Sequence, residues 1–402
     1  MNFNTFKAFH SRNYRLYFSG QSASLIGTWM QRTAVYWVIY VQTHSAFMLG
    51  VAVFSIQFPS FLFSLFGGTV ADKYDRYKVL LITQIASMVQ AVILTLVVLF
   101  THYTVAEILV ISVMLGIINA FDMPARQSLV YYMVDDEKDL GNAIALNSSM
   151  GNLAKLIGPA LSGIVLETLG AGICFMLNAL SFVAVIVSLL MMRLPEYIPR
   201  EQSKKVMEEL KEGLSYLRST PSIRIILLLI ALSSLLVIPY ANLFPVIAKM
   251  TLKGNATTFG YLSSFTGIGA IGGAIMLASL RPQVNRRKIL LLVTIIFGFG
   301  LILFSQSHSL IYALLFAAVS GFGMMSQATL VNTLLQTESS LEMRGRVISY
   351  FAMAYFGMQP LGALLIGGIS HNVGTPITIF FQGIVAVIMA VLMIPHFWKS
   401  VH

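Results

Sequence analysis

The sequence predicts an all-α membrane protein in which twelve transmembrane helices form two pseudo-symmetric six-helix halves. Three observations indicate this fold: the composition, the spacing of the apolar runs and the placement of the charges. Of the 402 residues, 57% are hydrophobic and only 10% are charged, whereas soluble domains are about 25% charged. So few charges cannot cover a soluble surface, and we therefore expect most of the surface to face lipid.

Twelve apolar segments are long enough to cross a bilayer, which takes about 20 residues of helix. Connections as short as 101–103 join some of them and indicate antiparallel helix hairpins. The first segment is too long for the core of a signal peptide, so we expect it to be retained as a signal anchor. The predicted spans are 16–40, 47–70, 79–100, 104–124, 141–168, 171–194, 222–248, 257–280, 288–305, 309–335, 345–370 and 374–397.

The basic residues concentrate at one end of these predicted helices. With the N-terminus in the cytoplasm, 22 of the 26 Lys and Arg residues fall on the cytoplasmic side, and the outer loops hold only Lys249 and Lys253. This positive-inside pattern predicts that both termini are cytoplasmic. The formal charge of +10 then faces the anionic inner leaflet of the bilayer, so nucleic acid is not expected as a partner.

A polar linker separates two similar halves. Residues 1–194 form the predicted N-terminal half, 195–221 a cytoplasmic linker with a surface helix, and 222–402 the C-terminal half. Similar segments recur in the two halves, and Pro159 and Pro360 within them are 201 positions apart, half the chain. Two parallel six-helix repeats are a transporter architecture, with the substrate site expected near the bilayer midplane between them.

A charged motif follows the second predicted helix and contains Gly68, Asp72, Lys73 and Arg76. The glycine is expected to permit close approach of a neighbouring helix. These residues resemble motif A of the major facilitator superfamily, G-x-x-x-D-[RK]-x-G-R-[RK]. The sequence departs from that motif at Asp75, where the motif usually has glycine.

Asp122 and Arg126 are four residues apart and share a face of the fourth predicted helix. The resemblance implies that motif A packs there. We therefore expect Asp72, Arg76, Asp122 and Arg126 to form a latch that closes the cytoplasmic side while the outside is open. The alternative is surface ion pairs, which contribute about 0–1 kcal/mol each.

The fifth predicted helix contains Gly158, Pro159 and Gly163, which resemble motif C of antiporters and exporters in the same superfamily. Ordinary close packing of small residues is the alternative. The strings RNYRLYFSGQ, LIGTWMQR, NAFDMPARQ, NAIALNSS and IGPALSG resemble the branch that includes enterobactin and macrolide exporters. That resemblance implies export driven by the proton gradient.

Two bases lie deep in predicted spans, where a charge costs roughly 2.5–3.5 kcal/mol or more. Arg32 and Lys155 belong to the first and fifth helices, which line the cavity in the superfamily that the chain resembles. We expect a cationic substrate site there. The alternative is a structural ion pair with Glu107 or Glu167. The predicted substrate-binding residues are Thr28, Gln31, Arg32, Ser148, Asn152 and Lys155.

Proton coupling has one candidate, Asp122, because the superfamily usually carries the proton on a carboxylate and no acid lies in the middle of a predicted span. The sequence has no G-x-x-x-x-G-K-[ST], H-E-x-x-H or C-x-x-C motif, so an ATP-driven pump, a metal site and a cofactor are not expected. A membrane enzyme is disfavoured as well, since no nucleophile with a matching base stands out.

The sequence therefore predicts a proton-coupled exporter of a small amphipathic or anionic molecule, such as a siderophore or a drug, that works by alternating access. We expect a monomer in the inner membrane. A lipid or lysophospholipid carrier is one alternative, and a non-transporting membrane receptor or scaffold is another.

Overall fold

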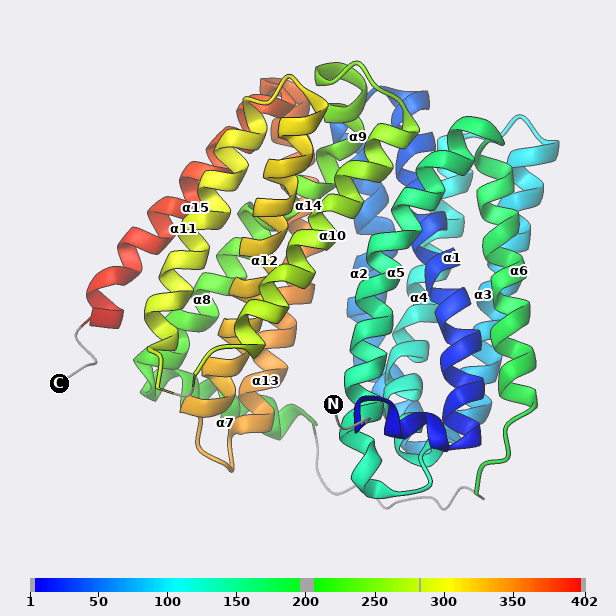
Figure 1. The fold of residues 1–402 in the computed structure, drawn as a ribbon, viewed down its shortest axis with the longest axis horizontal. Coiled ribbons are helices and arrows are strands. Elements are labelled where there is room, and N and C mark those ends of the chain that lie inside the picture. The colour runs from blue at the N-terminus through cyan, green and yellow to red at the C-terminus, as the bar shows by residue number, and fades with distance from the viewer. Residues whose placement is uncertain (1–3, 196–205, 282, 399–402) are drawn as a thin grey trace. The chain divides into compact units, whose positions relative to one another are not determined.

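The computed structural model describes residues 4–195, 206–281 and 283–398, and every regular element among them is a helix (Figure 1). The predicted all-α class is confirmed. The helices are α1 (Arg12–Thr43), α2 (Ala46–Lys73), α3 (Arg76–Phe100), α4 (Val105–Leu129), α5 (Leu140–Thr168), α6 (Ala171–Leu190), α7 (Val206–Ser219), α8 (Pro221–Leu236), α9 (Phe244–Val246), α10 (Ala256–Ala278), α11 (Arg286–Ser305), α12 (Leu310–Glu338), α13 (Arg344–Ala352), α14 (Met358–Val373) and α15 (Thr375–Trp398), with 3₁₀ helices η1 (Asn4–His10), η2 (Val130–Met133), η3 (Glu137–Asp139) and η4 (Ile238–Leu243) and π-helices η5 (Ile247–Thr251) and η6 (Met353–Gly357).

Two compact units make up the chain. Unit 1 comprises residues 1–42 and 55–202, and unit 2 comprises 43–54 and 203–402. In unit 1, α3 packs along α4 and α6, and in unit 2, α11 packs in the same way along α12 and α15. Residues 43–54, which include the start of α2, group with unit 2, although the sequence places them in the N-terminal half.

Eleven helical segments of the described chain are long and apolar enough to cross a membrane. The predicted span that is not among these eleven is the first, 16–40. It corresponds to α1, a helix of 32 residues whose apolar run is interrupted by polar side chains. Gln21, Ser24 and Gln31 are each no more than 2% exposed. These polar groups therefore face the interior of unit 1.

Two predicted spans are broken rather than continuous. The predicted span 222–248 contains α8, η4, α9 and η5 in succession. Pro239 has no N–H to continue α8, and Tyr240 bonds instead to the Val237 carbonyl three residues back. Gln382 of α15 donates to the carbonyl oxygens of Leu236 and Val237, at 3.0 and 3.2 Å, and so pairs backbone acceptors at the break.

The second broken span is 345–370, in which α13 and α14 are separated by the π-helix η6. This wide turn packs against α8. Both interruptions belong to unit 2, and at the first of them Gln382 satisfies backbone groups that lipid could not.

The predicted linker helix is present as α7, and the part of the linker at 196–205 lies outside the described residues. An ion pair joins Glu212 of α7 to Arg346 of α13. Ser340 donates its backbone N–H to the Tyr216 hydroxyl at 3.2 Å, and Leu217 is buried. The helix is therefore fixed to unit 2.

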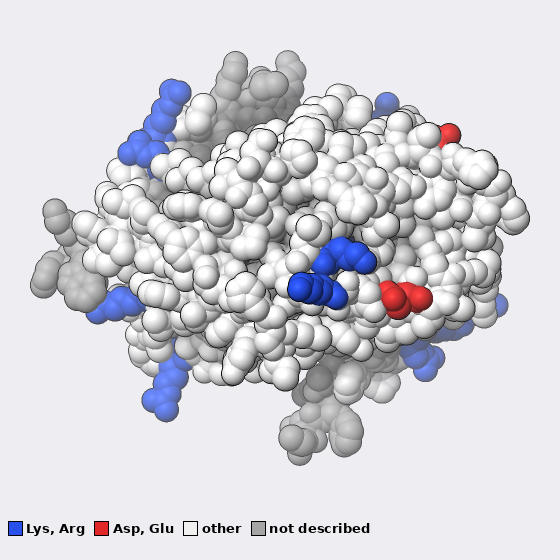
Figure 2. Space-filling view, turned by 90° about the horizontal axis from the view of Figure 1, so that it is seen from above, with Lys and Arg blue, Asp and Glu red and all other residues white. Residues whose placement is uncertain are grey.

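Charged side chains are scarce on one end of the molecule. Figure 2 looks onto this end and shows a surface with few Lys, Arg, Asp or Glu residues.

Candidate functional site

Two basic side chains approach one tryptophan in unit 1. The guanidinium carbon of Arg32 lies 5.1 Å from the centre of the Trp29 ring, and the Lys155 ammonium nitrogen lies 5.8 Å from it. Both distances are within the roughly 6 Å range of cation–π interactions. Lys155 is exposed near the middle of α5, and Arg32 of α1 is half-buried. We call Trp29, Arg32 and Lys155 the cation–tryptophan cluster.

The close packing of α5 on α1 sets the position of this tryptophan. A Cβ on Gly158 would lie 2.5 Å from the Trp29 Cβ, so glycine alone fits there without a shift. One turn later, the buried Ser162 hydroxyl donates to the Met30 carbonyl oxygen at 3.0 Å. Lys155 is three residues before Gly158, which brings it to the same side of α5 and within reach of the indole.

The other predicted motif C residues, Pro159 and Gly163, are also buried on α5. The helix continues through Pro159 from Leu140 to Thr168. These small residues of α5 thus face the protein interior, which both an antiporter motif and ordinary close packing require. Of the three, Gly158 makes the tight contact that positions Trp29.

Neither base of the cluster has a carboxylate within 4.0 Å among the residues that the structure describes. The sequence left open an ion pair with Glu107 or Glu167. Glu107 instead accepts the Thr104 N–H at 2.7 Å in the N-terminal cap of α4, and Glu167 is exposed near the end of α5. The described structure therefore gives no support to a structural ion pair, and the cluster is a site of positive charge.

Three of the predicted polar neighbours are at least partly accessible. The Thr28 hydroxyl donates to the Ser24 carbonyl at 2.9 Å, and the Ser148 hydroxyl donates to the Ile144 carbonyl at 3.0 Å. Asn152 is half-buried one turn before Lys155. The two hydroxyl hydrogens are therefore used within their own helices, while the hydroxyl oxygens keep the capacity to accept a hydrogen bond.

Gln31, the remaining predicted neighbour, has a different environment. Its side chain is 2% exposed, donates to Gln90 of α3 at 3.0 Å and accepts from Asn178 of α6 at 2.8 Å. Gln90 in turn donates to the Ile111 carbonyl of α4 at 3.3 Å. Gln31 is thus part of a buried amide network that joins four helices, and in this structure it does not line an accessible site.

The predicted motif A residues lie at the turn between α2 and α3. Asp72 and Arg76 form an ion pair at 3.8 Å, in which the aspartate side chain is 65% exposed and the arginine only 13%. Arg76 also donates to the Ala71 carbonyl at 3.1 Å and to the Tyr132 hydroxyl at 3.2 Å. The arginine is therefore held by several partners, whereas the aspartate remains accessible.

The glycine that makes the close approach is Gly67 rather than the predicted Gly68. A Cβ on Gly67 would lie 1.9 Å from the Ala120 carbonyl oxygen of α4, while a Cβ on Gly68 would meet no atom within 4 Å. The prediction for Gly68 is wrong in this respect. Successive residues of a helix point about 100° apart, so Gly68 faces away from α4 when Gly67 faces it. Lys73 lies over the Tyr74 ring at 5.8 Å.

Asp122 is 1% exposed in a polar pocket between α3 and α4. It pairs with Arg126 one turn along α4, and it accepts hydrogen bonds from Thr83 at 2.9 Å and Gln84 at 2.6 Å. The sequence indicated the pairing with Arg126 but not the two donors from α3. Those donors lie 39 and 38 residues away, and no local pattern connects them to Asp122.

The four residues of the expected latch form two ion pairs, each between residues four apart. One is the accessible pair of Asp72 and Arg76, and the other is the buried pair of Asp122 and Arg126. Tyr132, shortly after α4, contacts Arg76 through its hydroxyl and also through its ring, 5.7 Å away. This tyrosine links the turn after α2 to the end of α4.

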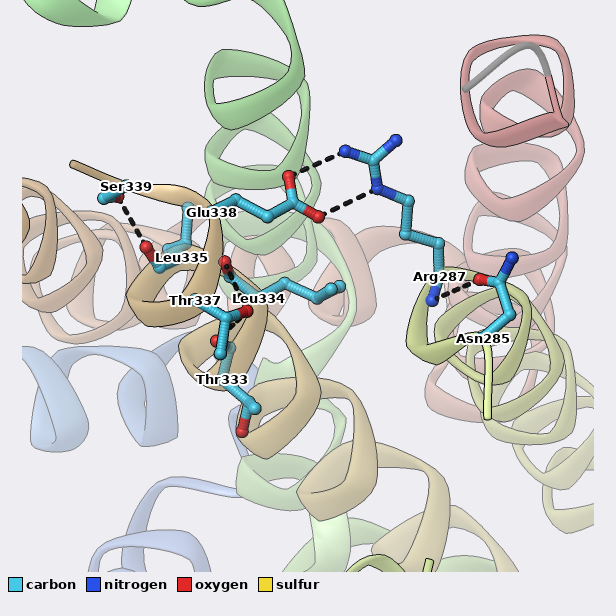
Figure 3. Close-up of polar contacts among 8 residues, drawn as sticks. All are labelled: Asn285, Arg287, Thr333, Leu334, Leu335, Thr337, Glu338 and Ser339. Carbon is cyan, nitrogen blue, oxygen red and sulfur yellow. Dashed lines mark hydrogen bonds and ion pairs between the residues drawn. The ribbon is translucent and has the colours of Figure 1, made fainter. Parts of the chain in front are cut away.

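Unit 2 has an ion pair at the corresponding helices, α11 and α12, which the sequence did not reveal. Arg287 donates from Nε and a terminal nitrogen to the two carboxylate oxygens of Glu338, at 2.9 and 2.7 Å (Figure 3). Asn285 caps α11 by accepting the Arg287 N–H at 3.1 Å. The segment 278–288, which contains Arg287, has no aspartate or glutamate, and Glu338 supplies a carboxylate from α12 instead.

No group of three or more His, Cys, Asp or Glu side chains that could hold a metal ion occurs in the part of the chain that the structure describes. The cation–tryptophan cluster itself offers two basic groups and one aromatic ring.

The comparisons with known proteins agree over the whole length of the chain. The family described as transmembrane secretion effector matches residues 3–399. The staphyloferrin A transporter of Staphylococcus aureus is 26% identical, with 92% of each chain covered. The enterobactin exporter of Escherichia coli is 24% identical over 95% of this chain and 91% of its own. Macrolide efflux protein A of Streptococcus pyogenes is 22% identical over 94% and 96%.

Solved structures show the same fold at lower identity. A transporter of the POT family in complex with 5-aminolevulinic acid superposes with a TM-score of 0.76 at 12% identity, over 98% of this chain and 97% of its own. A bacterial homologue of the human lysosomal transporter Spinster gives a TM-score of 0.70 at 14% identity, over 97% of both chains.

Proposed function

Because this chain belongs to the transmembrane secretion effector family of the major facilitator superfamily, we propose that it exports a small anionic or amphipathic molecule by alternating access. The cation–tryptophan cluster carries this proposal. Arg32 and Lys155 share one indole ring, and no carboxylate among the described residues neutralises them.

The energetics of the cluster favour a negatively charged ligand. A single base in the middle of a transmembrane helix costs roughly 2.5–3.5 kcal/mol, and two like charges near one ring add repulsion. A bound anion offsets both costs, and the exposed Lys155 is accessible to it. Trp29 adds a flat apolar surface, so a ligand with a planar or apolar body beside its negative group matches the cluster best.

The relatives support export of small molecules of this kind. Two of them are named for siderophores and one for macrolides. A siderophore or an acidic drug is therefore the substrate class that we propose for this chain.

Proton antiport is the proposed source of energy, with Asp122 as the group that carries the proton. Its support is the burial of this carboxylate among Thr83, Gln84 and Arg126, where a change of protonation would break the ion pair with Arg126. Opening of the latch could thereby be coupled to proton movement.

The proposed setting is the bacterial inner membrane, with both termini in the cytoplasm and the protein acting as a monomer. The positive-inside distribution of the basic residues supports the orientation of the termini.

Ligand binding to single variants tests the proposal. An anionic ligand found by a transport screen in proteoliposomes is compared with its neutral methyl ester. Lys155→Gln is expected to weaken binding of the anion by about 1–3 kcal/mol, the range for one hydrogen bond to a charged group. The ester should bind equally to both proteins, and the melting temperature should change little because Lys155 has no carboxylate partner to strand.

Ser149→Ala is the matched control on α5, since Ser149 is exposed, its hydroxyl bonds within its own helix, and it is not among the predicted substrate-binding residues. A large loss of thermal stability in Lys155→Gln, with unchanged affinity for the anion, would show that the lysine is structural and would contradict the proposed site.

A further inference from the structure

A cleft of unit 1, near the turn between α2 and α3, differs in chemistry from the cation–tryptophan cluster. Its volume is about 560 Å³, and it lies between the start of α3 and the chain that follows α6. It contains none of the residues of the cation–tryptophan cluster. Its lining residues are Asp75, Tyr77, Lys78, Met192, Arg193, Leu194 and Pro195.

The wall of the cleft is held by hydrogen bonds that do not involve the charged ends of its bases. Tyr77 donates its hydroxyl to the Leu189 carbonyl of α6 at 3.1 Å. Asn13 of α1 donates to the Arg193 carbonyl at 2.8 Å and accepts the Arg193 N–H at 3.0 Å. The backbone of Arg193 is therefore fixed while its side chain stays exposed.

The cleft has a net positive charge, because its two bases outnumber its one acid. Lys78 and Arg193 are exposed, and neither side chain has a carboxylate within 4.0 Å in the described chain. The acid that lines the cleft, Asp75, accepts the Tyr77 N–H at 2.9 Å as the N-terminal cap of α3. One carboxylate oxygen is thus committed to the helix, and two bases remain for an external anion.

The surroundings of the cleft indicate a lipid rather than a soluble anion. Leu190 and Met191, which lead from α6 into the cleft, are 62% and 51% exposed. They end an apolar transmembrane helix, so they lie where acyl chains meet headgroups. Two bases at the level of the headgroups, next to an exposed apolar helix end, match both parts of an anionic phospholipid.

We propose that this cleft binds the headgroup of an anionic phospholipid through Lys78 and Arg193, with its acyl chains along the end of α6. The bound lipid would join the start of α3 to the end of α6. The inference is independent of the transported substrate, because no residue of the cation–tryptophan cluster takes part.

Native mass spectrometry of the full-length protein in detergent, with equal amounts of phosphatidylglycerol and phosphatidylcholine, tests this site. Wild-type protein should retain phosphatidylglycerol preferentially. Each base near an anionic lipid surface contributes about a fivefold change in affinity, so the double variant Lys78→Gln/Arg193→Gln should bind phosphatidylglycerol roughly 25-fold more weakly. Binding of phosphatidylcholine should be unchanged.

The control variant Arg224→Gln/Arg281→Gln removes the same charge from exposed positions of unit 2 and should retain phosphatidylglycerol like the wild type. The charge-conserving variant Lys78→Arg/Arg193→Lys should retain it as well, and melting curves confirm that each variant is folded. Should the double variant unfold, the single changes Lys78→Gln and Arg193→Gln replace it, each with about a fivefold loss expected.

Three results would overturn the proposal. One is equal retention of the two lipids by the wild type. Another is an equal loss in the control variant, which would indicate general surface charge. The third is displacement of phosphatidylglycerol by inorganic phosphate that itself binds with the same dependence on Lys78 and Arg193, which would assign the cleft to a soluble anion.

Discussion

Gly158 of α5 lies so close to Trp29 of α1 that a Cβ at Gly158 would be 2.5 Å from the Trp29 Cβ. The atom that it would meet is next to the tryptophan backbone and cannot move independently of α1. The position of the indole beside Arg32 and Lys155 therefore depends on a hydrogen atom in place of a side chain at Gly158.

Gly158→Ala is expected to lower the free energy of unfolding by about 1–3 kcal/mol, the range for an overpacked interior. The same change should weaken binding of an anionic ligand, since Trp29 moves with α1. Melting temperature and ligand affinity in detergent are the measurements. Gly151→Ala on the same helix is the control, because a Cβ there meets no atom within 4 Å. Equal behaviour of the two variants would exclude this packing as a determinant of the site.

Asp72 and Asp122 should respond differently to replacement by asparagine. Asp122→Asn leaves Arg126 without a counter-charge in the interior, and we expect the free energy of unfolding to fall by about 3 kcal/mol. Asp72 is 65% exposed, so Asp72→Asn should cost less than about 1 kcal/mol. Thermal unfolding of the two purified variants measures the difference. A comparable loss in both would show that exposure does not separate the two ion pairs.

Transport should nevertheless depend on the exposed aspartate. If Asp72 and Arg76 belong to the latch, Asp72→Asn should lower transport sharply in proteoliposomes and increase the labelling of cysteines introduced on the cytoplasmic side. Unchanged flux together with unchanged labelling would reduce this motif to a signal for membrane topology.

The buried amide network predicts a stability effect at Gln31. Gln31→Leu removes the partner of both Gln90 and Asn178, and each buried polar group left unpaired costs about 1–3 kcal/mol. We expect a clear fall in melting temperature, with the affinity for an anionic ligand retained in the folded fraction. A loss of affinity for the anionic ligand without a change in melting temperature would instead show that Gln31 takes part in substrate binding.

Membrane topology can be measured with introduced cysteines, because the native Cys174 is buried. Ser219 at the end of α7 and His102 between α3 and α4 are both exposed. In intact cells an impermeant thiol reagent should label His102→Cys but not Ser219→Cys. The opposite labelling pattern would invert the proposed orientation.

The sequence by itself indicated the apolar helical segments, their number and the end of these segments at which the bases concentrate, but not the breaks within 222–248 and 345–370. These features follow from the length of apolar runs and from the cost of charge in lipid, which act on each segment separately. It also indicated Arg32 and Lys155, because a basic residue within a transmembrane span is costly whichever helices surround it.

The tertiary structure decided which polar residues belong together. Gln31 and Arg32 are neighbours in sequence, yet successive residues point about 100° apart around a helix, and the packing of α1 against α3 and α6 buries the glutamine while leaving the arginine beside Trp29. Likewise, Thr83 and Gln84 reach Asp122, and Glu338 reaches Arg287, only through contacts between helices. Helix rotation and long-range packing set these partners, and neither leaves a periodic pattern in the sequence.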